Sequence, residues 1–145
     1  MSTLVGEPSP PARILIVDDE VENRELLQII LKWSGFVTQL SASGEEALAN
    51  AAAEPPALIL VDLLMPGMDG YQFIARLKQT PETQAIPVIM LSAMNDSLTG
   101  KRALSAGADA YITKPIDRSA LCEQVRAVLS SRQSAHESDG APARR

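Results

Sequence analysis

The sequence has very little cysteine and histidine, and this scarcity excludes several classes of protein. Cys122 is the only cysteine among the 145 residues, so the chain cannot form an internal disulfide. Cysteine and histidine nowhere have the spacing of zinc ligands, since the one histidine, His136, stands alone in a polar segment. A reducing compartment fits this composition best.

The sequence also has no cluster of basic residues, no signal-peptide pattern in its first residues and no long apolar run. The formal net charge is -5, so the surface as a whole repels polyanions, and direct contact with nucleic acid is not expected. No window reaches the roughly 18 uninterrupted apolar residues of a membrane helix. Residues 1–12 have neither the basic start nor the apolar stretch of a signal peptide. We therefore expect a cytoplasmic protein that does not contact a membrane.

The length and composition are those of a single compact domain. Hydrophobic residues make up 46% of the chain and charged residues 21%, which is typical of a globular fold. The two ends differ from the rest, because residues 1–12 are rich in proline, serine and glycine and residues 131–145 have no apolar periodicity. We expect a domain over residues 13–130, preceded by a disordered tail and followed by a disordered tail or the start of a linker.

Short apolar runs alternate with helical patterns along this domain. Strands are predicted at residues 14–17, 37–40, 58–61, 88–91 and 110–112. Helices are predicted at residues 21–33, about 45–53, about 71–77, 98–106 and from Asp117 onward; the first should bury a stripe made of Leu26, Leu27, Ile30 and Leu31. Right-handed crossovers then give a doubly wound (βα)5 fold of the α/β class, with a parallel five-stranded sheet in the order 2-1-3-4-5.

Polar residues follow four of these strands, at what should be one edge of the sheet. Ligands of open parallel sheets bind beyond this edge. The residues are Asp18 and Asp19 after the first strand, Asp62 after the third, Ser92 after the fourth, and Thr113 and Lys114 after the fifth. Three carboxylates gathered together repel one another unless a pKa rises or a cation neutralises them. Because the candidate ligands are all oxygens, the pattern indicates Mg²⁺.

The same edge has the residues that phosphoryl transfer requires. A lysine and a hydroxyl beside the acids supply charge neutralisation and positioning around a phosphoryl group. A carboxylate oxygen can attack phosphorus and form an acyl phosphate. Asp62 lies between the outlying acids and the strands that end at Ser92 and Lys114, so we assign it the role of nucleophile.

Four motifs resemble those of response-regulator receiver domains, the phosphorylation switches of bacterial two-component signal transduction. They are ILIVDD at residues 14–19, LVDLLMPGMDG at 60–70, MLSA at 90–93 and GADAYITKP at 107–115. Their order and spacing match over about residues 13–130. The resemblance implies a flavodoxin-like fold of the kind found in chemotaxis regulators.

Position by position, the resemblance implies a site. Asp62 takes a phosphoryl group, as an aspartyl phosphate, from a phosphohistidine on a sensor histidine kinase or histidine phosphotransfer protein. Asp19 and Asp62 hold Mg²⁺ directly, Asp18 helps through water, and the main-chain carbonyl of Leu64 is a further ligand. Lys114 pairs with the phosphate, and its bond to the following proline is typically cis in this family.

The resemblance also implies a switch. Ser92 hydrogen-bonds the phosphorylated form and draws the following loop inward, and Tyr111 then turns from exposed to buried. This reshapes the face made by the fourth helix, the fifth strand and the fifth helix, which a downstream protein target binds. Such a chain catalyses only its own phosphorylation and dephosphorylation. It is a monomer or a phosphorylation-linked homodimer.

Two positions depart from the chemotaxis type of receiver. Leu64 stands two residues after Asp62, and Met94 two residues after Ser92, and both are apolar. They flank the approach of water to the phosphorylated aspartate. We hypothesise that they exclude this water and lengthen the life of the phosphorylated state.

Other interpretations stay open at this stage. Ser92 also suits a helix cap, Lys114 a surface lysine and Tyr111 simple strand packing. The chain could be a stand-alone regulator, a phosphorelay intermediate, or the receiver segment of a longer response regulator or hybrid histidine kinase. A magnesium-dependent phosphohydrolase also forms an aspartyl phosphate, but it needs an acid two residues after its nucleophile, where Leu64 stands.

Overall fold

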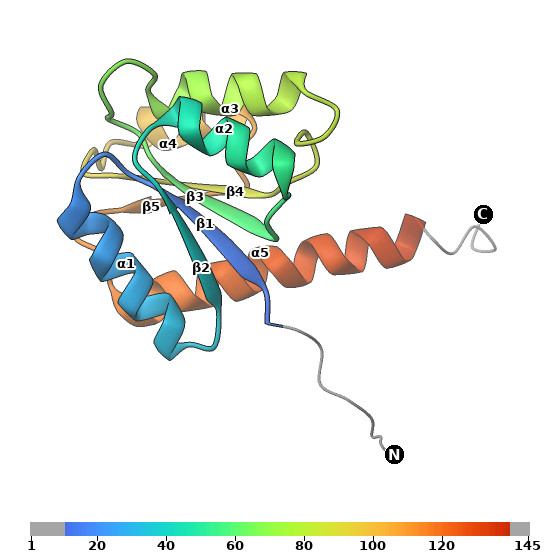
Figure 1. The fold of residues 1–145 in the computed structure, drawn as a ribbon. Coiled ribbons are helices and arrows are strands. Elements are labelled where there is room, and N and C mark those ends of the chain that lie inside the picture. The colour runs from blue at the N-terminus through green and yellow to red at the C-terminus, as the bar shows by residue number, and fades with distance from the viewer. Residues whose placement is uncertain (1–10, 140–145) are drawn as a thin grey trace.

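The computed structural model describes residues 11–139, which form strands and helices in strict alternation (Figure 1). The strands are β1 (Arg13–Val17), β2 (Val37–Ser41), β3 (Leu58–Asp62), β4 (Val88–Ser92) and β5 (Ala110–Thr113). The helices are α1 (Val21–Trp33), α2 (Gly44–Ala53), α3 (Gly70–Gln79), α4 (Ser97–Ala106) and α5 (Arg118–Asp139). Apart from the end of α5, these elements lie within two residues of the positions predicted from the sequence.

The strands form one parallel sheet in the order β2-β1-β3-β4-β5, which confirms the predicted topology. The register pairs Val17 of β1 with Val61 of β3, and Asp62 of β3 with Leu91 of β4. The carboxyl ends of the central strands are therefore level with one another. Residues that come directly after these strands meet at one edge of the sheet.

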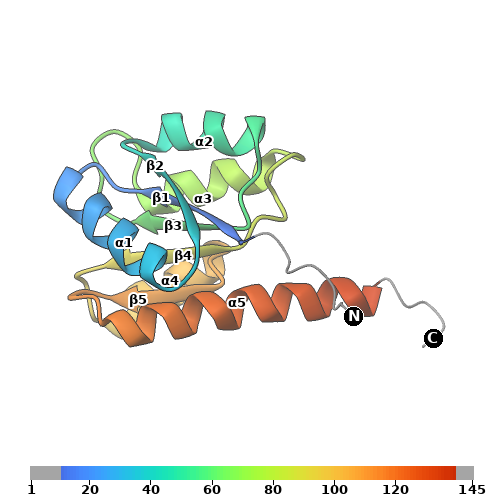
Figure 2. The ribbon, with the colours of Figure 1, turned by 60° about the horizontal axis from the view of Figure 1, so that its bottom comes forward.

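Helices cover both faces of the sheet (Figures 1 and 2). Successive residues of a strand point to opposite faces, so Leu15 and Val17 pack with α2, α3 and α4, while Ile14 and Ile16 pack with α1 and α5. Strands β3 and β4 are buried along their whole length. Burial on both faces explains why their sequences are almost purely apolar.

The helix starts that border the functional edge are capped by their own side chains. Asp69 accepts a hydrogen bond from the Gln72 N–H over 2.9 Å, and the Gln72 side chain accepts one from the Asp69 N–H, which forms a capping box at the start of α3. Asp96 caps α4 by accepting from the Thr99 N–H over 2.7 Å. These bonds fix where the loops after β3 and β4 end.

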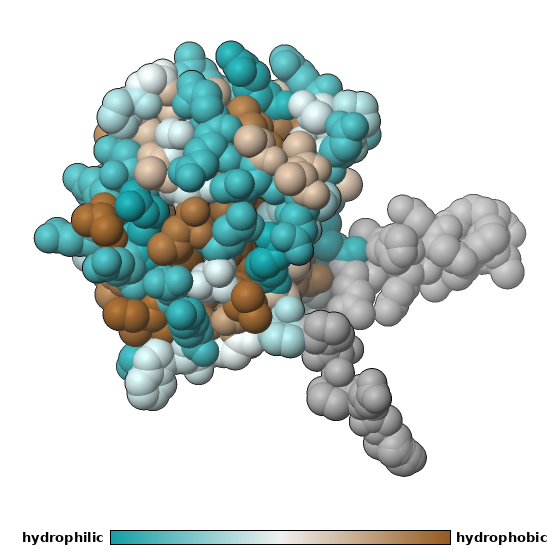
Figure 3. Space-filling model, in the orientation of Figure 1, coloured by the Kyte–Doolittle hydropathy of each residue, from teal (hydrophilic) through white to brown (hydrophobic). Residues whose placement is uncertain are grey.

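One stripe residue of α1 lies elsewhere than predicted. Leu27, Ile30 and Leu31 are buried against the sheet and α5, but Leu26 is 51% exposed. Four neighbouring apolar positions span more of a helix than one sheet face can cover. Leu26 therefore joins Ile29 and Trp33 on the outer side of α1, where Figure 3 shows apolar patches among hydrophilic residues near α1 and β2.

Helix α5 continues past residue 130, to Asp139. The segment expected to be an unstructured tail from residue 131 is thus helical up to that point, and residues 1–10 and 140–145 lie outside the described residues. Arg132 bonds to the Asp109 carboxylate and to the Ala85 carbonyl, each over about 3 Å, which fastens this part of α5 to the starts of β5 and β4. Among the described helices, none is long and apolar enough to cross a membrane.

Candidate functional site

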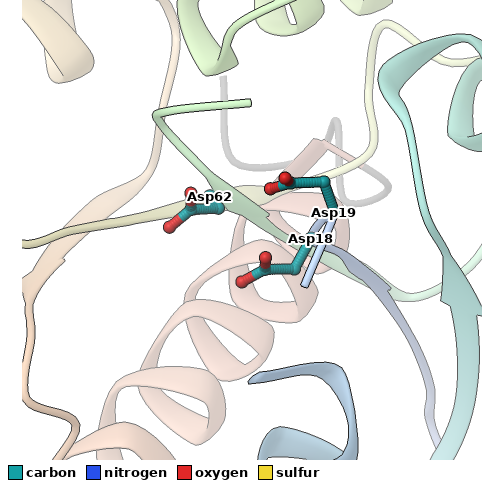
Figure 4. Close-up of side chains that lie close together, drawn as sticks. All are labelled: Asp18, Asp19 and Asp62. Atoms are coloured by element: carbon teal, nitrogen blue, oxygen red, sulfur yellow. The ribbon is translucent and has the colours of Figure 1, made fainter. Parts of the chain in front are cut away.

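The ends of β1 and β3 bring three carboxylates together. Asp18 and Asp19 come directly after β1, and Asp62 is the last residue of β3. One carboxylate oxygen from each lies within 4.8 Å of the others, and Figure 4 shows the three groups on the same side of the strand ends. The structure therefore confirms the prediction that these acids converge, and their oxygens form a cluster that could hold a metal ion.

Two of these acids are buried and one is exposed. Asp18 is fully buried and Asp62 is 7% exposed, whereas Asp19 faces solvent. Burial raises the pKa of both Asp18 and Asp62 above the ordinary carboxyl value; the Glu20 N–H, which donates to Asp18, and the ammonium of Lys114, which bonds to Asp62, act in the opposite direction. Two buried carboxylates at such short range need a positive charge to ionise fully.

Lys114 supplies one positive charge. Its Nζ lies 2.6 Å from Asp62 Oδ1 and 3.9 Å from Asp18 Oδ2. The lysine follows β5 directly, and its N–H donates to the Ser92 carbonyl over 2.8 Å, which places its backbone against the end of β4. The peptide bond from Lys114 to Pro115 is cis, as the resemblance implies.

Asp18 has one oxygen that no protein donor satisfies. Its Oδ1 accepts from the Glu20 N–H over 3.0 Å, but Oδ2 has no hydrogen-bond partner among the described residues. A buried carboxylate oxygen left in this way costs free energy. A hard divalent cation coordinates oxygen ligands of this kind, so the donor set fits one.

Ser92 lies beside the carboxylates at the end of β4. It is buried, and its Oγ accepts from the Met94 N–H over 3.0 Å. The register aligns Leu91 with Asp62 across the β3–β4 pair. Ser92 is thus close to Asp62, and its hydroxyl is held by a hydrogen bond within the loop that follows β4.

Leu64 and Tyr111 lie at the margin of this group. Leu64 follows Asp62 by two residues in the loop to α3, and its side chain is 62% exposed. Tyr111 is half-buried in β5, packed towards Gly100 of α4, and its hydroxyl donates to the Met94 carbonyl. The ring is therefore already largely turned towards the protein.

Two residues, Arg24 and Gly70, support the site without having been singled out from the sequence. Arg24, in the first half of α1, donates to the Asp18 carbonyl over 2.7 Å. Gly70 begins α3 so close to the loop after β3 that a Cβ there would lie 2.9 Å from the Leu63 Cα. Only glycine permits this approach. Of these residues, Gly70 had a sequence signal, since it ends the turn-rich stretch 66–70.

Comparison with known proteins identifies the family. A family model described as the response regulator receiver domain matches residues 14–126. The chain is 41% identical over 118 residues to the phosphate regulon transcriptional regulatory protein PhoB of Escherichia coli strain K12, covering 81% of this chain and 51% of PhoB. The protein belongs to the family of response-regulator receiver domains, which are signalling domains whose standard function is that of a phosphorylation switch.

Solved structures agree with this assignment. A putative response regulator from Chloroflexus aurantiacus J-10-fl is 36% identical with a TM-score of 0.79, over 83% of this chain and 98% of that one. The receiver domain of a signal transduction histidine kinase from Syntrophus aciditrophicus is 39% identical with a TM-score of 0.76, over 83% and 91%. The chain spans about half the length of PhoB and about a quarter of the response regulator PleD of Caulobacter vibrioides, so it matches only a segment of each of these longer proteins.

Proposed function

We propose that this chain is a signalling switch that accepts a phosphoryl group on Asp62 in the presence of Mg²⁺. The observation that carries the proposal is the contact between Lys114 Nζ and Asp62 Oδ1, at 2.6 Å, inside the cluster of three acids. The ammonium group of Lys114 lies where the negative charge of a phosphoryl group on Asp62 would develop. Stabilisation of that charge by positioned groups is the main source of rate in phosphoryl transfer.

The proposed metal ligands are Asp18, Asp19, Asp62 and the main-chain carbonyl of Leu64. Asp19 and Asp62 would bind the ion directly and Asp18 through water. The unsatisfied Oδ2 of Asp18 supports this assignment, because a cation and its water would supply the missing partner. When bound, Mg²⁺ would neutralise the charge of the carboxylates and of the phosphoryl oxygens.

In the proposed reaction, a carboxylate oxygen of Asp62 attacks the phosphorus of a phosphohistidine. The O–P bond forms as the P–N bond breaks, and the imidazole nitrogen of the donor keeps the electron pair. Lys114 favours the ionised form of Asp62 before the attack and would pair with the phosphoryl oxygens afterwards. Dephosphorylation is the attack of water on the same phosphorus, which releases phosphate and restores the carboxylate.

Ser92 and Tyr111 would carry the signal outward. Once Asp62 is phosphorylated, Ser92 Oγ would turn from the Met94 N–H to the phosphoryl group. Met94 also holds the hydroxyl of Tyr111, so the ring and the surface of α4, β5 and α5 would respond. We propose that this surface binds a downstream protein target, with phosphorylation-linked homodimerisation as a further outcome.

A sensor histidine kinase or a histidine phosphotransfer protein is the proposed phosphodonor. The length of the relatives favours a second form of the same function, in which these residues are the receiver segment of a longer response regulator or of a hybrid histidine kinase. A DNA-binding activity would then belong to the rest of such a protein. The phosphohydrolase is disfavoured, since the exposed Leu64 offers no acid–base group two residues after Asp62.

The test is intact-mass analysis after incubation with acetyl phosphate. We expect one phosphoryl addition that requires Mg²⁺ and is lost with a chelator or in Asp62→Asn. Asp117→Asn is the matched control, because it changes an exposed acid at the start of α5 to a residue that caps a helix equally well. Addition to Asp62→Asn, or no addition to the folded native chain, would overturn the proposal.

A further inference from the structure

Helices α3 and α4 carry four basic residues and no acidic one. The basic residues are Arg76 and Lys78 on α3 and Lys101 and Arg102 on α4. The chain as a whole has a net charge of -5, so its acids lie elsewhere. Lys78 is partly buried and donates to the Gln84 and Ile86 carbonyls, so the exposed positive charge of α4 comes from the adjacent residues Lys101 and Arg102.

An open groove of about 480 Å³ runs beside α4 at this surface, and its lining combines apolar and basic groups. The lining residues are Tyr71, Leu98, Lys101, Arg102, Ser105 and Ala106. Leu98 is 66% exposed, which leaves most of a large apolar side chain uncovered. Neither Lys101 nor Arg102 forms a salt bridge with an acid among the described residues, so no carboxylate there neutralises either charge.

Local contacts hold part of the groove in place. The Arg102 guanidinium lies over the Tyr71 ring, 4.4 Å from its centroid. The Tyr71 hydroxyl donates to the Thr99 carbonyl of α4 over 3.3 Å, which joins α3 to α4. The groove is thus lined by an aromatic ring and an arginine that are already positioned, and these are residue types that anchor protein interfaces.

This groove differs from the surface of α4, β5 and α5 proposed as the output face. Gly100 points from α4 towards the Tyr111 ring of β5. Leu104, the other exposed leucine of α4, lies about 120° around the helix from Leu98. Helix α4 therefore presents Leu98 and Arg102 to the groove and Leu104 to another exposed side, with Lys101 between the two leucines; the groove is lined by Leu98, Lys101 and Arg102 but not by Leu104.

We propose that the α3–α4 groove binds an acidic segment of a partner protein, in which carboxylates flank a large apolar side chain. The apolar side chain would lie against Leu98 and Tyr71, and the carboxylates would pair with Lys101 and Arg102. Charge complementarity favours this partner, because its carboxylates would meet two cations on a protein whose net charge of -5 disfavours non-specific binding of an acidic segment. Two cations beside an apolar wall suit a peptide better than the regular phosphates of nucleic acid, which need a longer row of cations.

The proposal does not depend on the chemistry of Asp62, so the two can fail separately. The test displays a random-sequence peptide library against the immobilised full chain and measures the affinities of the enriched peptides in solution. We expect enriched sequences in which Asp or Glu flanks Leu, Ile, Phe or Trp. Phosphorylation of the same preparation is followed by intact mass, which keeps the two results distinguishable.

Matched variants assign the binding to the groove. Lys101→Glu and Leu98→Ser should each lower the affinity for the enriched peptides by about tenfold, because each variant loses one good interface contact. The controls Lys32→Glu, in the last turn of α1, and Leu104→Ser change residues of the same type and similar exposure outside the groove, and should change affinity by less than about twofold. Circular dichroism checks that each variant is folded.

Three results would overturn the proposal. The first is enrichment of sequences without an acidic preference. The second is equal loss of binding in the groove variants and their controls. The third is binding of duplex DNA or of anionic phospholipid vesicles that is lost in Lys101→Glu and kept in Lys32→Glu, which would assign the groove to another kind of polyanion.

Discussion

Ser92 and Tyr111 are connected through the backbone of one residue, Met94. The Met94 N–H donates to Ser92 Oγ over 3.0 Å, and the Met94 carbonyl accepts from the Tyr111 hydroxyl. A change in the partner of Ser92 frees the N–H at one end of this residue and disturbs the bond at its other end. In the proposed switch, Met94 is therefore the one residue that connects Ser92 with Tyr111 of β5.

Tyr111→Phe tests this connection. Loss of one hydrogen bond to the Met94 carbonyl should lower the free energy of unfolding by about 1 kcal/mol, measured by urea denaturation, while phosphorylation by acetyl phosphate continues. The Met94 amide resonance should shift. The control Tyr71→Phe loses a bond to the Thr99 carbonyl instead and should leave that resonance in place; equal shifts in both variants would show that Met94 does not report on Tyr111.

Lys114→Gln should abolish most of the phosphorylation. The variant removes the cation that lies 2.6 Å from Asp62 Oδ1. Removal of one group that stabilises developing charge typically costs a factor of about 100 or more in rate. The rate of phosphorylation is measured as the rate of mass increase with acetyl phosphate. The control is Lys32→Gln, which changes an exposed lysine of α1. If Lys114→Gln were phosphorylated at the rate of the native chain, Lys114 would have no role in the mechanism.

The acids of the site could be predicted from the sequence because the ends of the strands can be located in it. Apolar runs mark the strands, and a parallel sheet brings the residues after them to one edge. Asp18 and Asp62 therefore converge as expected. The role of Arg24 could not be predicted in this way, because most arginines in helices are solvated. Only the folded structure shows that Arg24 donates to the Asp18 carbonyl.

Burial and helix ends were less predictable for the same physical reason. Whether Leu26 or Leu27 faces the sheet depends on the angle at which α1 packs, which four adjacent apolar positions leave undecided. The continuation of α5 past residue 130 is accompanied by contacts of Arg132 with Asp109 and Ala85, which are far away in sequence. Contacts of this kind join residues far apart in the chain, so a local sequence pattern does not reveal them.

Stability in metal-free solution should depend on pH through Asp18 and Asp62. Burial raises the pKa of both carboxyls, so the native state retains protons at pH values where the unfolded chain has lost them. Their contribution to stability is fully present below the ordinary carboxyl pKa of about 4. It is lost as the pH rises through the raised native values.

Urea denaturation with a chelator, over a pH series, measures this effect. The unfolding free energy should fall as the pH rises above about 4, and Asp18→Asn should make the fall shallower because one of the two titrating groups is gone. Asp117→Asn, which changes an exposed acid, should leave the slope as it is in the native chain. Parallel curves for the native chain and Asp18→Asn would mean that the Asp18 pKa is not raised.

Leu64→Asn should shorten the life of the phosphorylated state. The Leu64 side chain is 62% exposed and stands two residues after Asp62, and Met94, 44% exposed, stands two residues after Ser92. Both cover the proposed approach of water with apolar surface, whereas an amide can hydrogen-bond the attacking water and hold it.

The measurement is the rate at which phosphorylated protein returns to its original mass after the phosphodonor is removed. Leu104→Asn introduces the same amide at a similarly exposed leucine of α4 and serves as the control. We expect Leu64→Asn to dephosphorylate about tenfold faster than the control, which corresponds to about 1.4 kcal/mol in the activation barrier. Equal rates in the two variants would mean that access of water past Leu64 does not limit hydrolysis, and the lifetime would then have to be set by the groups that hold the phosphoryl oxygens, Lys114 and Ser92.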